Sequence, residues 1–369
     1  MPRPTAPLFR PFTVGPLTLP NRLVMAPMTR SFSPGGVPGD DVAAYYRRRA
    51  EDGVGLIVTE GTVVAHPAAA NDPRVPRFHG DDALAGWAKV VAEVHDAGGR
   101  VMPQLWHVGT MRKAGSEPNP DVPPVGPSGL FKPERKVGEP MTEKEIADLI
   151  AAFARAAADA MRLGFDGIEI HGAHGYLIDQ FFWEGTNVRD DAWGGDLVKR
   201  TRFAAEIVRA CRRATSPDFP ILLRFSQWKQ QDYTARLAPG IDDLMRFLTP
   251  LADAGVDVFH CSTRRFWEPE FEGSGSSLNL AGWTKKLTGK PVITVGSVGL
   301  DGDFFGFVKG QSSGAASLDA LIDMVAANEV DLVAVGRAML ADPRWVTKVR
   351  EGRLSELGGF TSERLKTLV

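Results

Sequence analysis

The sequence contains only two cysteines, Cys211 and Cys261, among its 369 residues. Two cysteines cannot form a disulfide framework, and they cannot supply the four thiolates of an iron–sulfur cluster. Net charge is also low, because 43 lysines and arginines oppose 45 aspartates and glutamates and leave −2. Without a basic stripe or an acidic tail, the chain is not expected to bind nucleic acid. We therefore expect two reduced thiols in a cytoplasmic protein.

Long apolar runs are absent as well. No uncharged apolar run approaches the roughly 18 residues needed to span a membrane. The most apolar helix-like stretch, Leu149–Met161, is interrupted by Arg155 and Asp159, and Met1–Pro11 lacks the apolar centre of a signal peptide. The sequence thus predicts a soluble protein with no membrane partner. Its length is ordinary for a large α/β barrel or a two-domain enzyme.

The sequence does contain a regular alternation of short apolar runs with longer helical patterns. Eight candidate strands follow one another along the chain: Leu23–Met28, Val54–Gly61, Arg100–Trp106, Gly167–His171, Ile221–Phe225, Val256–Cys261, Val292–Gly296 and Leu332–Gly336. Several are almost wholly apolar, as expected for parallel strands that are covered on both faces. The clearest helices are Ala83–His95 and Ile146–Leu163, and Thr142 and Glu145 stand at capping-box spacing before the second.

The strand–helix unit repeats eight times without a break in composition. This repeat predicts an α/β fold, a single (β/α)8 TIM-barrel domain over residues 1–369 with long loops at its C-terminal face. The alternative is a doubly wound open sheet, but no Gly-x-Gly-x-x-Gly motif follows an early strand. The segment Phe12–Asn21, with turns at Gly15-Pro16 and Pro20, is predicted to form a hairpin lid at the bottom of the barrel.

Polar side chains stand at the C-terminal ends of the predicted strands, so a barrel would gather them at one mouth. They comprise an amide, two imidazoles, a phenol and two guanidinium groups, from Gln104, His171, His174, Tyr176, Arg224 and Arg337. Four long links follow strands and lie at the same face: Gly109–Pro140, Gly172–Lys199, Ser262–Asn279 and Ser297–Ser317. Loops of this length in a compact domain are usually functional or disordered.

The last two predicted strands end in Gly296-Ser297 and Gly336-Arg337. Small residues at these positions let backbone N–H groups approach an anion, and an arginine adds a charge-assisted fork. The alternative is that both glycines only make tight turns between strand and helix. The combination of Gly-Ser beside Gly-Arg favours a phosphate site.

His171 and His174 lie three residues apart, and Tyr176 follows two residues later. The two imidazoles could bind a metal, form a structural pair or donate hydrogen bonds to a substrate. For a metal, only Glu169 offers a nearby third ligand, so we expect none. The neighbouring phenol favours a role in proton transfer.

Arg224 would be a buried cation in the barrel mouth, which is costly without an anionic partner. A reduced flavin, which is anionic near N1, would supply that partner. Gln104 offers a donor and an acceptor that match the pyrimidine edge of a flavin, although a lone glutamine more often bonds to backbone. The role of Trp106 is equally undecided, since a tryptophan is often simply part of a hydrophobic core.

Six sequence blocks extend this pattern over nearly the whole chain: Leu8-Phe9 with Asn21–Arg30, Thr59–Thr62, Gln104–Gly109, His171–Phe181, Asn187–Gly195 with Arg200–Phe203, and Val335–Arg337. In content and order they closely resemble the old yellow enzyme family of NAD(P)H:flavin oxidoreductases. The blocks HGAHGYLIDQF and NVRDDAWGG together are highly specific.

The resemblance implies FMN at the C-terminal face of the barrel. The residues implied to line its ring system are Pro27, Met28, Thr29 and Gly61. Those implied for its pyrimidine edge are Gln104 and Arg224, and those for its phosphate are Gly296, Ser297, Gly336 and Arg337. The substrate's carbonyl oxygen would lie on His171 and His174, with Trp106 nearby and Tyr176 as the acid.

The implied reaction is a ping-pong ene-reduction of a small-molecule substrate. NADPH or NADH reduces FMN and leaves, hydride then passes from N5 to Cβ of an α,β-unsaturated carbonyl compound, and Tyr176 protonates Cα. An amine dehydrogenase or demethylase of the same family is the alternative, and a non-catalytic barrel for a phosphorylated ligand is a third. Thr110, Trp193 and the segments 227–236 and 265–267 depart from the common family pattern. These departures leave the identity of the substrate open. The sequence also does not decide whether the protein forms a homo-oligomer.

Overall fold

The computed structural model describes residues 3–303, 306 and 309–369. Within them, eight parallel strands close into a barrel in the order β10-β11-β12-β3-β4-β5-β8-β9. Their bounds are β3 Leu23–Met25, β4 Leu56–Val63, β5 Val101–Trp106, β8 Ile168–His174, β9 Ile221–Lys229, β10 Val258–Ser262, β11 Val292–Val295 and β12 Leu332–Val335. All eight predicted strands are present, and closure of the sheet excludes the open doubly wound alternative.

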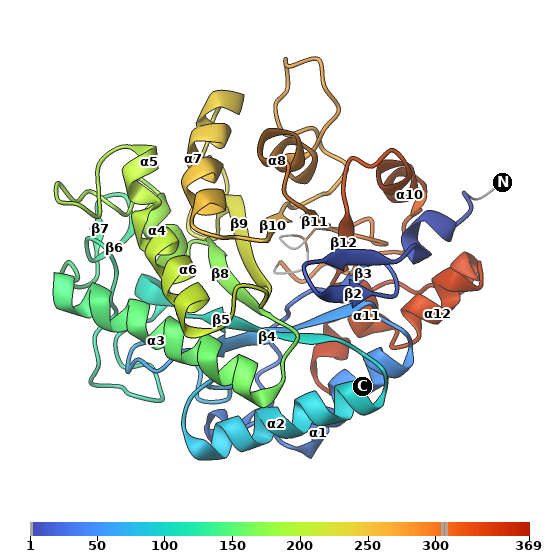
Figure 1. The fold of residues 1–369 in the computed structure, drawn as a ribbon, viewed down its shortest axis with the longest axis horizontal. Coiled ribbons are helices and arrows are strands. Elements are labelled where there is room, and N and C mark those ends of the chain that lie inside the picture. Colours follow the sequence, from blue (N-terminus) through green and yellow to red (C-terminus); the bar gives the residue numbers. More distant parts are fainter. Residues whose placement is uncertain (1–2, 304–305, 307–308) are drawn as a thin grey trace.

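Helices connect the strands and form the outer layer of the molecule (Figure 1). Their bounds are α1 Asp40–Glu51, α2 Asp81–Asp96, α3 Glu143–Leu163, α4 Leu177–Phe182, α5 Leu197–Arg200, α6 Arg202–Ala214, α7 Ile241–Asp253, α8 Leu280–Thr288, α10 Asp319–Ala326, α11 Arg337–Ala341 and α12 Trp345–Arg350. Short 3-10 turns occur at η1 Ala6–Phe9, η2 Pro34–Gly36, η3 Gly109–Met111, η4 Leu354–Glu356 and η5 Ser362–Leu365. The barrel is therefore of the (β/α)8 type.

Helix α3 shows how local sequence fixes an element. The Thr142 hydroxyl accepts a hydrogen bond from Glu145 N at 3.2 Å, and Glu145 Oε2 accepts one from Thr142 N at 2.7 Å. This confirms the predicted capping box, which satisfies two backbone donors at the helix start. The helix ends at Leu163 and is capped by Gly164, whose φ of 86° suits a residue without a Cβ.

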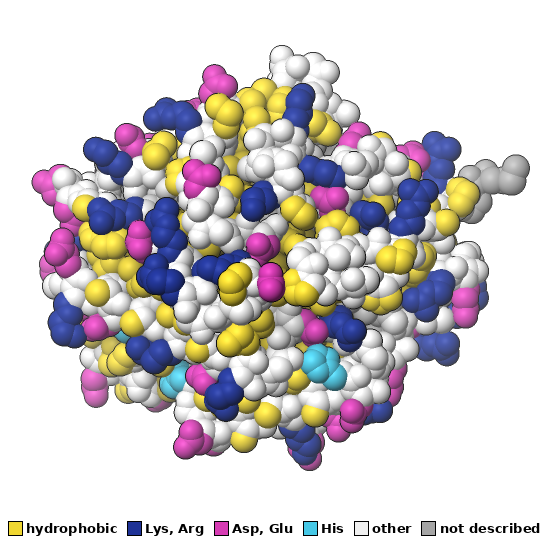
Figure 2. All heavy atoms as spheres, viewed as in Figure 1, with side chains coloured by type: hydrophobic (Ala, Val, Ile, Leu, Met, Phe, Trp, Pro, Cys, Tyr) yellow, Lys and Arg dark blue, Asp and Glu magenta, His cyan; other side chains and the backbone are white. Residues whose placement is uncertain are grey.

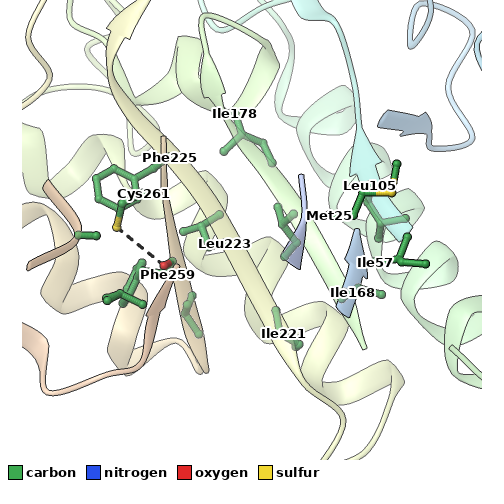
Figure 3. Close-up of a cluster of buried hydrophobic side chains, with 14 of the residues drawn as sticks. Met25, Ile57, Leu105, Ile168, Ile178, Ile221, Leu223, Phe225, Phe259 and Cys261 are labelled. Carbon is green, nitrogen blue, oxygen red and sulfur yellow. Dashed lines mark hydrogen bonds between the residues drawn. The ribbon is translucent and has the colours of Figure 1, made fainter. Parts of the chain in front are cut away.

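Side chains alternate along each strand between two hydrophobic layers. On β9, Leu223 and Phe225 point outward into the large cluster between strands and helices, which Figure 3 shows together with Phe259 and Cys261 of β10. Leu222, on the same strand, belongs instead to the cluster inside the barrel. Both cysteines are buried and unpaired.

The predicted N-terminal hairpin closes the bottom of the barrel. Strands β1 (Phe12–Val14) and β2 (Leu17–Leu19) pair antiparallel around Gly15, whose φ is 54°. Leu17 and Leu19 pack into the cluster inside the barrel, so the hairpin covers the barrel interior at the end opposite the long loops. The hairpin prediction is confirmed.

Two of the predicted long loops at the C-terminal face contain regular elements. The link Gly109–Pro140 contains a second small hairpin, β6 (Leu130–Lys132) with β7 (Arg135–Lys136), and the link Gly172–Lys199 contains helix α4. Residues 304–305 and 307–308 of the predicted loop Ser297–Ser317 lie outside the described residues.

In the described ranges, no helix combines the length and apolar character needed to cross a membrane. The face drawn in Figure 2 intersperses basic and acidic side chains, in agreement with the balanced composition.

Candidate active site

A cavity of about 380 Å³ opens where the barrel strands end. Its walls come from β3, β5, β8, β9, β10, β11 and β12 and from the C-terminal segment of the chain. Thirteen of the fourteen residues predicted for the site line it: Pro27, Met28, Thr29, Gln104, Trp106, His171, His174, Tyr176, Arg224, Gly296, Ser297, Gly336 and Arg337. The fold thus brings together residues that lie more than 300 positions apart.

Gly61 is the one predicted residue that does not line this cavity. A Cβ at this position would lie 2.6 Å from Cε3 of the Trp106 ring. The absence of a side chain therefore lets Trp106 pack against strand β4. Gly61 supports the cavity wall from behind through Trp106.

Arg337 dominates one end of the cavity. Its guanidinium donates to the carbonyl oxygens of Gly302 and Asp303 at 2.6 and 3.0 Å, and to the Ser297 hydroxyl at 3.3 Å. Ser297 and Gly296 have φ values of 53° and 150°, which direct this turn toward the arginine. The carbonyl groups hold the guanidinium in place without neutralising its charge. The charge is therefore available to bind an anion such as a phosphate.

Gln104 and Arg224 lie at the deep end of the cavity. Gln104 Nε2 donates to Glu169 Oε1 at 2.8 Å, and Arg224 Nη2 donates to the Ser262 hydroxyl at 3.2 Å. Burial alone would raise the pKa of Glu169, but attraction to His260 and Arg224 holds that pKa below its ordinary value. Glu169 is therefore ionised, and its negative charge balances the buried arginine.

Five rings form a connected aromatic wall of the cavity. The His171 ring centroid lies 5.1 Å from that of His174 and 5.1 Å from that of Tyr176. Trp106 meets Tyr176 edge-on at 4.8 Å, and Trp228 stacks on His174 at 4.7 Å. His174 has a φ of 66°, at a register shift between β8 and β9 that directs its ring into the cavity. A non-glycine residue in this region is strained and is typical of functional sites.

The ionisation states of these groups follow from their burial. Burial, and secondarily the Arg224 charge, lowers the pKa of His171 and of His174 well below the ordinary imidazole value. Both rings are neutral at pH 7. His171 Nδ1 accepts a hydrogen bond from Ala173 N at 3.3 Å, which leaves its hydrogen on Nε2. Burial raises the pKa of Tyr176 despite a hydrogen bond with Gln230, so the phenol keeps its proton.

The comparison with known proteins identifies the family. The model of the NADH:flavin oxidoreductase / NADH oxidase family matches residues 7–356. The chain belongs to this family. Its members are the old yellow enzymes, which use FMN and NAD(P)H, and the chain is accordingly an FMN-dependent NAD(P)H oxidoreductase.

Two curated relatives and one solved structure show the range of this family. NADH oxidase of Thermoanaerobacter brockii is 34% identical over 360 residues, which is 95% of this chain and 52% of the relative. The chain thus spans about half the length of that protein, whose activity as a whole is not carried over. Rice (Oryza sativa subsp. japonica) 12-oxophytodienoate reductase 7 is 32% identical, covering 94% of this chain and 88% of the relative. Morphinone reductase in complex with tetrahydroNAD is 28% identical with a TM-score of 0.79, covering 97% of this chain and 93% of that one.

The family's cofactor fits the residues that line the cavity. At the deep end, Arg224 Nε and Trp106 Nε1 are buried without a hydrogen-bond partner in the described protein. Such groups call for a ligand, because a buried polar atom without a partner is unfavourable. At the other end, Arg337 presents its charge beside Ser297 and two glycines. Polar groups for a heterocycle and a cationic end for a phosphate are what FMN requires.

Sequence reasoning missed several residues of the cavity wall. Trp228 and Ser262 lie near the ends of β9 and β10, and Gln230 directly follows β9. Only the unusual composition of the segment 227–236 pointed to Trp228 and Gln230. Phe360 and Leu365 come from the C-terminal segment beyond the last predicted strand. No sequence signal locates these two, because a tail's position depends on tertiary packing.

The C-terminal segment is held at the cavity by Arg30. Its guanidinium Nη2 donates to the carbonyl oxygens of Arg364, Leu365 and Thr367 at 3.3, 3.3 and 2.7 Å. Arg30 follows directly on Thr29, so one loop both lines the cavity and fixes the tail beside it. Among the described residues, no three His, Cys, Asp or Glu side chains converge to hold a metal ion.

Proposed function

We propose that this chain is an ene-reductase, which transfers a hydride from NADPH or NADH through FMN to the Cβ of an α,β-unsaturated carbonyl compound. The observation that carries this proposal is the position of Tyr176 beside His171 and His174 on one wall of the cavity. A protonated phenol and two neutral imidazoles supply one acid and two hydrogen-bond donors. The names of the relatives, 12-oxophytodienoate reductase and morphinone reductase, support a reductive reaction.

Each group has a distinct role in this proposal. His171 and His174 hold the carbonyl oxygen of the substrate and draw electron density toward it. Tyr176 delivers the proton to Cα and is reprotonated from solvent, so that one hydride and one proton are added across the double bond. Bound FMN supplies the hydride chemistry. Trp106 and Trp228 orient the histidine and tyrosine rings through the contacts described above.

The cofactor contacts are proposed on the same basis. We assign Gln104 and Arg224 to the pyrimidine edge, and the ring system to the loop residues Pro27, Met28 and Thr29. We assign the phosphate to Gly296, Ser297, Gly336 and Arg337. Gly61 contributes indirectly, because it leaves room for the Trp106 ring that lines the cavity. Residues 1–369 then form one FMN-binding barrel domain, in which donor and substrate take turns at the same site.

The test separates the two half-reactions of the Tyr176→Phe variant by stopped-flow absorbance of the flavin. Reoxidation by cyclohexenone should slow by a factor of about 10² to 10⁴, the usual contribution of a general acid. Reduction by NADPH should stay within about twofold of wild type, because no proton from Tyr176 is needed. Equal slowing of both half-reactions would contradict the role of Tyr176 as the acid.

His171→Ala serves as the companion variant. It should weaken binding of a phenol ligand, read from its charge-transfer absorbance, by about tenfold or more, since it removes one hydrogen-bond donor to the ligand oxygen. FMN should remain bound. Loss of flavin from this variant would mean that His171 is structural. Oxidation of an amine by wild-type protein, without reoxidation by cyclohexenone, would favour the amine dehydrogenase alternative.

A further inference from the structure

A chain of three buried side chains lies behind the deep end of the cavity. Glu169 Oε1 accepts from Gln104 Nε2 at 2.8 Å, and Glu169 Oε2 accepts from His260 Nδ1 at 2.6 Å. Glu169 and His260 are fully buried, and Gln104 is 3% exposed. Strands β8 and β10, which carry Glu169 and His260, are separated by β9. The bond between them therefore crosses the barrel interior, below the residues that line the cavity.

This chain fixes the orientation of the Gln104 amide. An ionised carboxylate can only accept hydrogen bonds, so the amide must turn its NH2 group toward Glu169. Reversing the amide would place Gln104 Oε1 against a carboxylate oxygen. Because His260 occupies the other carboxylate oxygen, Glu169 cannot rotate away. The Gln104 carbonyl is left as an acceptor for the cavity.

The same carboxylate also controls the charge at this end of the cavity. Arg224 is buried, and Glu169 is the carboxylate that attracts it. Among the described residues that line the cavity, charged side chains are arginines: Arg224, Arg264 and Arg337. Glu169 therefore lowers the positive potential that these arginines create at the deep end.

We propose that Glu169, held in place by His260, is a positioning residue that orients the Gln104 amide toward FMN and sets the reduction potential of the bound cofactor. The proposal concerns the FMN site alone and holds whatever the electron acceptor is. Charge near the pyrimidine part of a flavin changes the relative stability of its oxidised and reduced forms. A negative charge behind Arg224 disfavours the reduced, anionic form.

Glu169→Gln tests both parts, because it removes the charge and keeps the shape. His260 Nδ1 would still donate to the new amide oxygen, so the new NH2 group would face Gln104 and require its amide to reverse. The other tautomer of His260 would avoid this reversal, but it would leave a donor on Nε2, which has no partner in the described protein. The variant should thus turn a donor of Gln104, in place of its acceptor, toward the flavin.

Two measurements separate the two effects. Fluorescence titration of apoprotein with oxidised FMN should show affinity about tenfold weaker in Glu169→Gln, the loss expected for one misdirected hydrogen bond. Equilibration with a redox dye should show that reduced FMN gains about tenfold relative to oxidised FMN, which is a rise of about 30 mV in the two-electron potential. The N3–H group on the pyrimidine edge of FMN is the donor that the Gln104 carbonyl would accept from, and it is present in both the oxidised and the reduced cofactor. Reversal of the amide therefore weakens both forms alike and cancels in the potential, whereas the effect of the lost charge remains.

Asp52→Asn is the matched control. Asp52 is a buried carboxylate that accepts from Val346 N at 2.7 Å, and it precedes β4 at the opposite end of the barrel. Loss of this carboxylate should leave both FMN affinity and potential unchanged. His260→Leu is the second test variant. It removes the hydrogen bond from His260 that lowers the pKa of Glu169, so Glu169 should take up a proton more readily and lose its charge. It should shift both readouts in the same direction as Glu169→Gln.

An unchanged or lowered potential in Glu169→Gln, or in His260→Leu if the first variant does not fold, would overturn the charge role. Unchanged affinity for oxidised FMN would overturn the orienting role. Equal shifts in Asp52→Asn would show that any buried carboxylate has the same effect, and would also overturn the proposal. Reduction of cyclohexenone is not part of either readout, so failure of the ene-reductase proposal would be seen separately.

Discussion

Glu60 is a single carboxyl group that organises the loop beside the cavity. Its Oε2 accepts from the backbone N–H groups of Arg30 and Ser31 at 2.8 and 3.1 Å. These bonds hold Ser31 at a φ of 57°, directly after the residues that line the cavity. Burial raises the pKa of Glu60 from 4.5 to about 7, against the lowering effect of these two hydrogen bonds.

This raised pKa predicts a pH-dependent stability. Between pH 4.5 and about 7 the folded state holds a proton on Glu60 that the unfolded state has released. The contribution to the free energy of unfolding is therefore complete below pH 4.5 and is lost as the pH rises through about 7. At about 1.4 kcal/mol for each pKa unit, the loss is on the order of 3 kcal/mol.

Urea unfolding of wild type and Glu60→Gln from pH 5 to 8 measures this contribution. The difference between the two proteins should fall with rising pH, because the amide has no proton to release. Parallel curves for the two proteins would show that Glu60 titrates normally.

At the scale of elements, a buried ion pair joins β9 to α4. Lys229 Nζ lies 2.7 Å from Asp179 Oδ1, and both side chains are fully buried. Asp179 Oδ2 also accepts from Gly175 N at 2.7 Å, which ties the pair to the turn that carries Tyr176. The extension of β9 beyond its apolar part thus supports the cavity wall at Tyr176.

Lys229→Met should destabilise the protein by about 3–5 kcal/mol, because it leaves the Asp179 charge buried without its partner. The double variant Lys229→Met with Asp179→Asn should recover much of this loss, since the uncompensated charge is then gone. The free energies of unfolding in urea give the comparison. A single variant within about 1 kcal/mol of wild type would contradict the role of the pair.

The same extension shows the limit of sequence-based prediction. The apolar part of each strand was predictable, because burial on both faces leaves only apolar residues, as in Ile221–Phe225. Strand β9 continues through Ser226 and Gln227 to Trp228, which lines the cavity, and Lys229, which pairs with Asp179, and no strand pattern marks these four residues. Phe360, in the tail, was unpredictable for the different reason that its contacts come from residues far away in sequence.

At the scale of the whole molecule, the candidate site joins most of the barrel. Seven of the eight barrel strands, with their loops, and the C-terminal segment contribute to the cavity wall. The motif blocks predicted which side chains would meet, because barrel closure brings all strand ends to one mouth. A ligand that contacts all these walls binds the folded state only, so its binding adds directly to global stability.

FMN should therefore raise the thermal midpoint of the apoprotein. At a hundredfold excess over its Kd, one ligand adds about 2.7 kcal/mol, which for a chain of this length is about 3–4 °C. Riboflavin, which has no phosphate, lacks the contacts assigned to Ser297 and Arg337, and at the same concentration it should raise the midpoint less. In Arg337→Leu the two ligands should become nearly equal, because the charge that distinguishes them is gone. Scanning calorimetry of both proteins with each ligand measures this; an undiminished advantage of FMN in Arg337→Leu would place the phosphate elsewhere.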